Sequence, residues 1–133
     1  MNRKVLVDAS AFLAVILNEQ EKERIVEATK GCQALSPGCL KWEVGNAFSA
    51  MEKRRRLSAE QVQAGIQVFE KIPYEEVQVD LSEGPRIASK HGIYAYDAYY
   101  LAAASGKGVE LLSLDKAMKE IAEKEGIKLR NIS

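Results

Sequence analysis

Short apolar segments with strand character alternate with helical segments along the whole chain, and this alternation constrains the fold more than any other feature. The segments with strand character lie at 4–7, 32–36, 74–80, 109–114 and 127–132. Parallel strands that follow one another in a chain need a crossover between them, which is usually a helix. The alternation therefore predicts the α/β class, as a three-layer α/β/α sandwich around a central parallel sheet of four to five strands. At 133 residues, the chain is expected to form one domain over 1–133.

Capping residues and apolar periodicity mark the helices between these strands. Ser10 is expected to cap a helix over 11–17, and Ser58 begins a capping-box pattern at the start of a later helix. Asp115 is expected to cap the last helix, and Gly106 is expected to end the helix before it. Further helical segments are expected at 19–31, 38–56 and 82–92.

Charge and hydropathy exclude two classes of protein. Nineteen acidic and nineteen basic residues give a net charge of zero, which excludes non-specific binding of nucleic acid by an overall positive charge. The longest uninterrupted apolar run, 11–17, is too short to cross a membrane. Asp8 interrupts what would otherwise resemble the apolar region of a signal peptide, and no small-residue cleavage pattern follows. The cytoplasm is therefore the expected location.

The cysteine and histidine content argues against a zinc site. Cys32 and Cys39 are the only cysteines, and His91 is the only histidine. A structural zinc site takes four such ligands. We therefore expect two partly buried thiols and a histidine at a helix end. A disulfide between the cysteines stays open, because intracellular proteins of hyperthermophiles can contain one.

An aspartate, Asp8, interrupts the otherwise apolar stretch "KVLVDASAFLAVIL". A buried carboxylate is costly unless it is paired, hydrogen-bonded or bound to a metal. Asp8 stands at the carboxyl end of the first expected strand, and open parallel sheets bind their ligands at that end. Because Ser10 is expected to cap the following helix, capping does not account for Asp8, and a functional role is favoured.

Three further acidic residues are expected near the same edge of the sheet. Asp115 follows the strand 109–114 at a strand-to-helix junction. Asp97 shares a helix face with Leu101, so its side chain is expected to point inward. Glu43 lies at the edge of the apolar stripe of its helix, which consists of Leu40, Val44, Ala47 and Met51. Four carboxylates that converge raise one another's pKa values unless a cation joins them.

Oxygen ligands without Cys or His favour Mg²⁺ or Mn²⁺ as that cation. One or two such ions held between carboxylates suit the cleavage of phosphodiester bonds. Each acid by itself also has a structural interpretation: Asp115 as a helix cap, Asp97 as a partner of a helix dipole, and Glu43 as a solvated helix residue. The functional hypothesis therefore rests on the four residues together.

Four segments resemble, in their order and spacing, the signature segments of PIN domains: "VLVDASAF", "WEVGNAF", "YDAYYLAAA" and "LLSLDKAM". The segment "EKEGIKL" resembles the last helix and strand of that family, so the resemblance covers essentially the whole chain. Short PIN proteins of prokaryotes are mostly VapC-type toxins of type II toxin–antitoxin pairs. The resemblance implies an Mg²⁺- or Mn²⁺-dependent endoribonuclease that cuts single-stranded or looped RNA, by hydrolysis that leaves a 5′-phosphate and a 3′-hydroxyl.

The resemblance also implies a metal-binding quartet. Its four acidic positions are matched by Asp8, Glu43, Asp97 and Asp115. Asp8 and Asp97 are expected to be direct ligands of the main metal. Glu43 and Asp115 are expected to hold a second metal or to act through water.

Three polar residues match supporting positions of the family. Ser10 and Ser113 match hydroxyl positions near the metal, where they are expected to hydrogen-bond a ligand carboxylate or the metal-bound water. Asn46 matches a common amide position with a supporting role. For partners, the resemblance implies a homodimer and an antitoxin protein whose C-terminal segment covers the active-site groove.

Two groups of side chains have both an RNA-binding and a structural interpretation. The basic run at the end of helix 38–56 either contacts RNA phosphates or offsets the helix dipole, and it consists of Lys53, Arg54, Arg55 and Arg56. Aromatic side chains of the segment 94–100 either stack on unpaired bases or pack in the core or at a subunit contact, and they are Tyr94, Tyr96, Tyr99 and Tyr100.

Two alternative functions remain open. One is another Mg²⁺-dependent α/β domain that processes phosphates, such as a haloacid-dehalogenase-like phosphatase or a receiver domain. The phosphatase pattern needs a second acid two residues after Asp8, where this chain has Ser10. The other is a PIN-like scaffold that binds RNA or protein without cutting. Metal-dependent cleavage that is lost in an Asp8→Asn protein discriminates between a scaffold and a nuclease.

Overall fold

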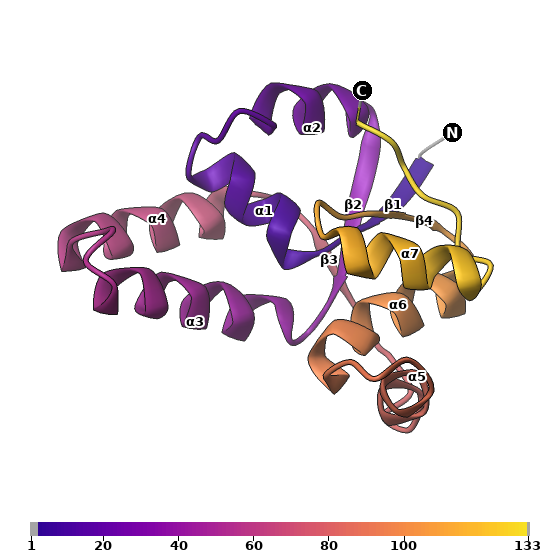
Figure 1. The fold of residues 1–133 in the computed structure, drawn as a ribbon. Helices are drawn as coiled ribbons and strands as arrows, with labels where there is room; N and C mark the ends of the chain where they lie inside the picture. The colour runs from indigo at the N-terminus through magenta and orange to yellow at the C-terminus, as the bar shows by residue number, and fades with distance from the viewer. Residues whose placement is uncertain (1–2, 133) are drawn as a thin grey trace.

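The computed structural model describes residues 3–132 as four parallel strands and seven helices. The strands are β1 Arg3–Val7, β2 Cys32–Pro37, β3 Glu75–Val77 and β4 Glu110–Leu112. They form one sheet in the order β3-β2-β1-β4, and each neighbouring pair is parallel. Helices lie on both sides of this sheet (Figure 1), as the predicted three-layer α/β/α sandwich requires.

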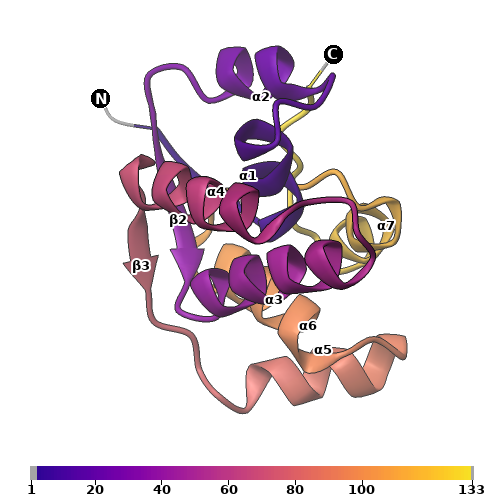
Figure 2. The same ribbon diagram turned by 90° about the vertical axis from the view of Figure 1, so that its left-hand side faces the viewer.

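Helices occupy every crossover between these strands, as parallel pairing requires. They are α1 Ala9–Ile16, α2 Lys22–Ala28, α3 Leu40–Lys53, α4 Ala59–Lys71, α5 Glu83–His91, α6 Ala95–Lys107 and α7 Lys116–Lys124. The pair α3 and α4 extends away from the sheet (Figure 1), and Figure 2 shows the two helices side by side. The predicted capping box at Ser58 is present at the start of α4.

The central position of β1 explains why the N-terminal segment is so apolar. β1 lies between β2 and β4, and its Leu6 is paired with Leu35 on one side and Leu111 on the other. Val5 and Leu6 are fully buried because both faces of a parallel sheet are covered by helices. The strand ends at Val7, so the next residue stands at the carboxyl edge of the sheet, as the sequence predicted.

Helix α6 is buried along most of its length and packs directly against the sheet. It contacts β1, β2 and β4, and its buried residues include Ala98, Leu101 and Ala103. A helix that is apolar on most of its surface is typical of a position inside a domain. This packing holds the first turn of α6, which contains Asp97, over the carboxyl edge of the sheet.

Two glycines allow neighbouring helices to approach closely. A Cβ atom added at Gly65 in α4 would stand 2.6 Å from the ring of Phe48 in α3. A Cβ atom added at Gly84 in α5 would overlap the ring of Tyr99 in α6. These contacts fix α4 against α3 and α5 against α6, and thereby fix two helices that carry site residues.

The start of α1 differs from the prediction that Ser10 caps a helix beginning at Ala11. The helix begins at Ala9, and Asp8 is its N-cap, with its Oδ1 atom accepting a hydrogen bond of 3.2 Å from the backbone N–H of Ala11. Aspartate and serine both favour this position, so the sequence alone did not separate them. Since Ser10 lies inside the first turn, its hydroxyl is free to make other contacts.

Two further boundaries differ from the prediction. The segment 127–132 forms no named strand, because only Leu129 pairs with the short strand β4, through a bridge to Leu111. The sheet therefore has the lower of the predicted strand numbers within residues 3–132. Helix α6 continues past Gly106 to Lys107, since Gly108 and not Gly106 adopts the left-handed conformation that ends it, with φ of 64°.

The cysteines are free thiols. Cys32 is the first residue of β2, and Cys39 lies two residues after its last residue, Pro37. The strand alone separates Cys32 from Pro37 by about 16 Å, which puts the two cysteines beyond disulfide reach. Burial raises the pKa of the Cys39 thiol to about 11. Within residues 3–132, none of the helices has the length and apolar character needed to span a membrane.

Candidate active site

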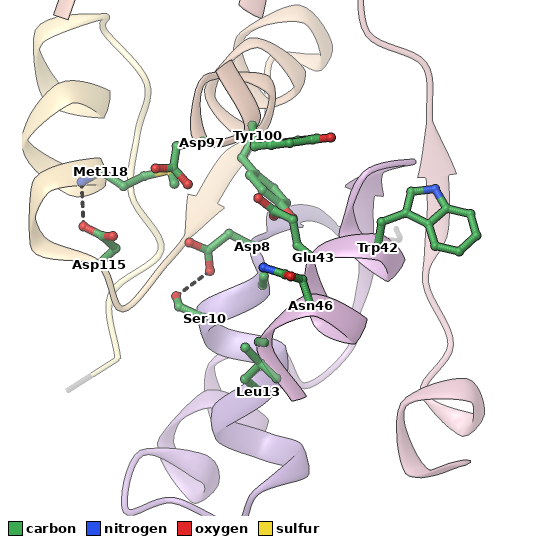
Figure 3. Close-up of a pocket in the computed structure, with 13 residues that line it drawn as sticks. Asp8, Ser10, Leu13, Trp42, Glu43, Asn46, Asp97, Tyr100, Asp115 and Met118 are labelled. Carbon is green, nitrogen blue, oxygen red and sulfur yellow. Dashed lines mark hydrogen bonds between the residues drawn. The ribbon is translucent and has the colours of Figure 1, made fainter. Parts of the chain in front are cut away.

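A cavity of about 550 Å³ opens at the carboxyl edge of the sheet, and four acidic side chains from different parts of the chain line it. Figure 3 shows these side chains around the end of β1. They are Asp8 after β1, Glu43 in α3, Asp97 in α6 and Asp115 before α7. The structure thus brings all four sequence-predicted acids to one pocket, which we call the acidic pocket.

Asp8 is the most buried of the four acids, with 2% of its surface exposed. Its Oδ1 atom accepts hydrogen bonds from the Ser10 hydroxyl at 2.6 Å and the Ala11 backbone N–H at 3.2 Å. Its Oδ2 atom accepts from the Ser113 hydroxyl at 2.5 Å. Burial raises the pKa of Asp8, and the bonds from the two hydroxyls oppose this shift. Asp8 therefore has neutral hydrogen-bond partners but no cation among the contacts of the described residues.

The two serine hydroxyls join the ends of β1 and β4 around Asp8. Ser113 Oγ accepts a hydrogen bond of 3.0 Å from the backbone N–H of Asp115, and Ser10 Oγ accepts one of 3.0 Å from that of Leu114. A hydroxyl has a single proton, which each serine donates to Asp8. Both serines were predicted as supporting residues, and the structure places both against a carboxylate of the acidic pocket.

Glu43 is held by a buried tyrosine. It lies in the first turn of α3, and the hydroxyl of Tyr100 in α6 donates a hydrogen bond to its Oε2 atom. Burial is the main cause that raises the pKa of Glu43, and the charges of Asp97 and Asp8 add to it, whereas the bond from Tyr100 opposes it. Burial and the bond to Glu43 also raise the pKa of Tyr100, so its hydroxyl keeps its proton and acts as a donor.

Asp97 and Asp115 lie on the α6 and α7 sides of the acidic pocket. Asp97 is half-buried in the first turn of α6, and its pKa is raised by burial and then by the charge of Asp115. Asp115 caps α7, because its Oδ1 atom accepts a hydrogen bond of 3.1 Å from the backbone N–H of Met118. The capping interpretation of Asp115 is therefore correct, and the same residue also lines the pocket.

The donor set of the acidic pocket fits a hard divalent cation. Among the described residues that line it, none is Lys, Arg or His, and the acids supply carboxylate oxygens only. Such oxygens are the ligands preferred by Mg²⁺ and Mn²⁺. Within residues 3–132, no three Asp, Glu, Cys or His side chains stand close enough to form a metal cage as they are. The pocket is therefore an open cavity lined by carboxylates that repel one another, and a bound cation would relieve that repulsion.

Other sequence-predicted residues lie at different places. Asn46, one turn after Glu43, lines the acidic pocket. The basic run 53–56 lies at the far end of α3, about 16 Å along the helix axis from Glu43, and does not line the pocket. Its role in RNA binding stays a prediction. His91 is the last residue of α5, as expected, and its Nε2 atom lies 2.8 Å from Glu125 Oε2.

Sequence reasoning missed two contributions to the pocket. Trp42 lines it, although its exposed position beside Glu43 attracted no prediction. Tyr100 was grouped with the other tyrosines, whereas the structure separates their roles. Tyr99 donates a hydrogen bond of 3.0 Å to the carbonyl of Leu81. The signal for Tyr100 was its spacing, because a residue three positions after Asp97 lies on the same helix face.

The chain is similar in sequence to known proteins. A sequence model described as "PIN domain" matches residues 5–124 of the chain. Ribonuclease VapC3 of Pyrobaculum aerophilum is 30% identical over 122 residues, which cover 88% of this chain and 93% of that protein.

Two solved structures are similar in fold. PAE2754 from Pyrobaculum aerophilum has a TM-score of 0.64 at 21% identity, over 91% of this chain and 87% of that one. FitAcB from Neisseria gonorrhoeae has a TM-score of 0.65 at 16% identity, over 96% of each chain. These two likenesses concern the fold.

Proposed function

This chain belongs to the PIN domain family, and from that membership we propose that it is a divalent-metal-dependent endoribonuclease that hydrolyses RNA phosphodiester bonds. One observation carries the proposal: four carboxylates from four separate segments line a single pocket that contains no cationic side chain among the described residues. The name of the relative Ribonuclease VapC3 supports RNA as the substrate.

We propose Mg²⁺ or Mn²⁺ as the cation, with Asp8 and Asp97 as its direct ligands and with Glu43 and Asp115 binding a second ion or acting through water. The cation supplies the charge that activates a water molecule and stabilises the oxygen leaving phosphorus. Burial and mutual repulsion raise the pKa values of Asp8, Glu43 and Asp97, so the site gains most from a cation when these groups are ionised.

The neighbouring side chains keep the carboxylates in position. Ser10 and Ser113 hold the two oxygens of Asp8, and Tyr100 holds Glu43. Hydrogen bonds of this kind fix the direction in which a carboxylate presents its remaining lone pairs. Asn46 reaches the pocket with an amide that has donors for a phosphate oxygen.

The family membership also supports a biological setting, which we include in the proposal. The chain is the toxin of a type II toxin–antitoxin pair, it forms a homodimer, and it acts in the cytoplasm on cellular RNA. An antitoxin protein is its partner. Size-exclusion chromatography of the chain alone, and of the chain co-expressed with the product of a neighbouring small reading frame, measures both associations.

Cleavage assays test the enzymatic part of the proposal. Labelled, partly single-stranded RNA is incubated with the protein in Mg²⁺, in Mn²⁺ and in chelator, together with the Asp8→Asn and Asp97→Asn variants. Asp80→Asn is the matched control, because Asp80 is an exposed aspartate outside the acidic pocket. We expect cleavage that needs metal, disappears in both pocket variants and persists in the control.

The outcome of that assay also decides the alternative of a binding scaffold. A protein that binds neither Mg²⁺ nor Mn²⁺ and cleaves no RNA contradicts the proposal and favours the scaffold. Cleavage that continues unchanged in Asp8→Asn points to a contaminating nuclease and contradicts it as well.

A further inference from the structure

Two large aromatic rings stand exposed at the acidic pocket. Trp42 is 69% exposed and Tyr96 is 60% exposed, and both line the cavity that contains the carboxylates. Folding favours the burial of such rings, because each carries a large apolar surface. The fold buries Tyr100 from the same cavity wall but leaves these two rings in solvent. Because both rings are exposed at the acidic pocket, a ligand bound there can contact them.

Each ring precedes an acid of the pocket in the sequence. Trp42 comes directly before Glu43 in the first turn of α3, and Tyr96 comes directly before Asp97 in the first turn of α6. The rings are therefore carried by the same helical turns that position the carboxylates. In Figure 3, Trp42 lies on the side of Asp8 and Glu43 that is opposite to Asp115.

The surroundings of both rings suit a nucleotide chain. Tyr96 also lines a second cavity, of about 330 Å³, whose walls include Pro37, Val77 and Tyr99. Tyr96 thus stands between the acidic pocket and a hollow with a mixed lining, in which Glu76 and Gln78 lie beside the apolar side chains and which offers space for a base. Lys41 Nζ lies over the Trp42 ring, 4.9 Å from its centroid, and adds a positive charge that attracts phosphate groups.

The arrangement favours RNA over a protein as the occupant. A protein-docking surface is usually a contiguous apolar patch, whereas carboxylates lie among the residues that line the pocket with these two rings. A single-stranded nucleic acid alternates negatively charged phosphates with flat apolar bases, and proteins bind it with aromatic platforms beside positively charged groups. Here Lys41 and the cation of the proposed nuclease site supply that positive charge. Bases inside a duplex already stack on each other and do not offer a free face.

We propose that Trp42 and Tyr96 each stack on an unpaired base of the RNA next to the phosphate held at the acidic pocket, and that they thereby select single-stranded or looped RNA. The inference rests on the proposed nuclease function for the position of that phosphate. It assigns the two rings to substrate binding, which determines affinity for unpaired RNA and leaves hydrolysis to the carboxylates.

Cleavage kinetics on a single-stranded RNA test the proposal with ring-removing and ring-keeping variants. Trp42→Ala and Tyr96→Ala are each expected to raise KM about tenfold with little change in kcat, since stacking contributes to binding of each base. Trp42→Phe and Tyr96→Phe keep a ring and are expected to retain most of the affinity. Tyr94→Ala is the matched control, because Tyr94 is 84% exposed but does not line the pocket.

Fluorescence gives a second readout that needs no cleavage, because Trp42 is the only tryptophan of the chain. The Asp115→Asn protein, whose asparagine also caps a helix well, is titrated in Mg²⁺ with a six-nucleotide RNA. We expect the single-stranded hexamer to quench Trp42 emission and its blunt duplex to quench it much less. The Tyr96→Ala change in the same background is expected to weaken the hexamer titration about tenfold.

The two readouts separate failure of this inference from failure of the proposed function. If the wild-type protein cleaves RNA and both Ala variants keep its KM, the stacking role is wrong and the nuclease function stands. Unchanged KM in both Ala variants is also the result expected if the two rings bind a protein partner and not RNA. If no protein cleaves RNA but the hexamer quenches Trp42 in a Tyr96-dependent way, the rings do bind bases and the nuclease function is wrong. Equal effects of Tyr94→Ala and Tyr96→Ala also contradict the inference.

Discussion

Asp8 and Glu125 are two carboxylates that each accept several hydrogen bonds, but their surroundings carry opposite charge. Glu125 is contacted by His91 at 2.8 Å and Lys90 at 3.0 Å, and these contacts lower its pKa. Asp8 is contacted by two serine hydroxyls and a backbone N–H, and burial raises its pKa.

The difference matches the roles proposed for the two carboxylates, a structural one for Glu125 and a metal-binding one for Asp8. Glu125 follows α7, and its partners Lys90 and His91 lie at the end of α5. These contacts therefore connect the two helices. At Asp8 the chain brings further acids and no cation among the described pocket residues. A fold that leaves a buried charge without an opposite charge forgoes stability at that position. The proposed divalent cation would supply that opposite charge from solution.

The largest expected difference between Asp8 and Glu125 is the effect on RNA cleavage of replacing each carboxylate by its amide. Asp8→Asn is expected to lower kcat for RNA cleavage at least about 10³-fold, because a metal ligand that stabilises charge in the transition state is worth several kcal/mol. Glu125→Gln is expected to leave kcat within about twofold. Single-turnover cleavage of a labelled RNA measures both. A similar loss in the two variants contradicts the distinction between the two carboxylates.

Metal addition and removal come next in size. Mg²⁺ or Mn²⁺ at about one hundred times its Kd is expected to stabilise the protein by about 2.7 kcal/mol, since the ion binds the folded state only. Thermal unfolding with and without chelator measures the shift. Glu125→Gln is expected to show the wild-type shift, whereas Asp8→Asn is expected to lose most of it. An unchanged shift in Asp8→Asn places the ion elsewhere.

The hydrogen bond from Tyr100 to Glu43 is expected to have a smaller effect. Tyr100→Phe keeps the buried ring but removes the hydroxyl that holds Glu43. Removal of a hydrogen-bond partner of a metal-binding carboxylate typically lowers metal affinity or activity by about 10–100-fold. We therefore expect about a tenfold decrease in kcat with little change in KM. Tyr99→Phe is the control, because its hydroxyl bonds a backbone carbonyl away from the pocket. Equal kcat in the wild type and Tyr100→Phe would remove this positioning role.

The smallest expected effects concern stability against pH in chelator, and they have opposite signs. The lowered folded-state pKa of Glu125 means that its contribution is present above its ordinary value of 4.5 and is lost as pH falls through the lowered value. Glu125→Gln is therefore expected to destabilise by about 1 kcal/mol or less near neutral pH, since its lysine and arginine partners are exposed. The difference should vanish in acid.

Asp8 is expected to behave in the opposite way in the same experiment. Its folded-state pKa is raised above the ordinary value of 3.8, so the folded state is favoured below 3.8 and loses that advantage as pH rises through the raised value. Asp8→Asn is therefore expected to gain stability relative to the wild type as pH rises. Urea unfolding at several pH values measures both variants. Parallel pH profiles would show that the two carboxylates do not differ in charge compensation.

Much of this molecule follows from local sequence signals. The apolar residues of β1 required a strand covered on both faces, and the strand-end rule then placed Asp8 at the carboxyl edge of the sheet. The capping box at Ser58 and the cap at Asp115 depend on residues within one helical turn, which is why both were predicted correctly.

Errors arose where two nearby residues competed for one local role. Asp8 and Ser10 both suit a helix cap; Asp8 takes that role, and Ser10 Oγ instead accepts a hydrogen bond from the backbone N–H of Leu114. Gly106 and Gly108 both suit a helix end, and the chain adopts the left-handed conformation only at the second. The strand expected at 127–132 needed a long edge on β4, but β4 has only three residues.

The sequence by itself determined the fold class, the family and the four acids, because strand and helix periodicities and short motifs are local properties of the chain. Only the tertiary structure decided that both predicted serines bond Asp8, that Tyr100 holds Glu43, and which rings stand beside these acids. The contact of Tyr100 with Glu43 spans 57 positions and that of Ser113 with Asp8 spans 105. Such contacts depend on how the helices pack on the sheet, and no local sequence pattern specifies which residues so far apart in the chain come together.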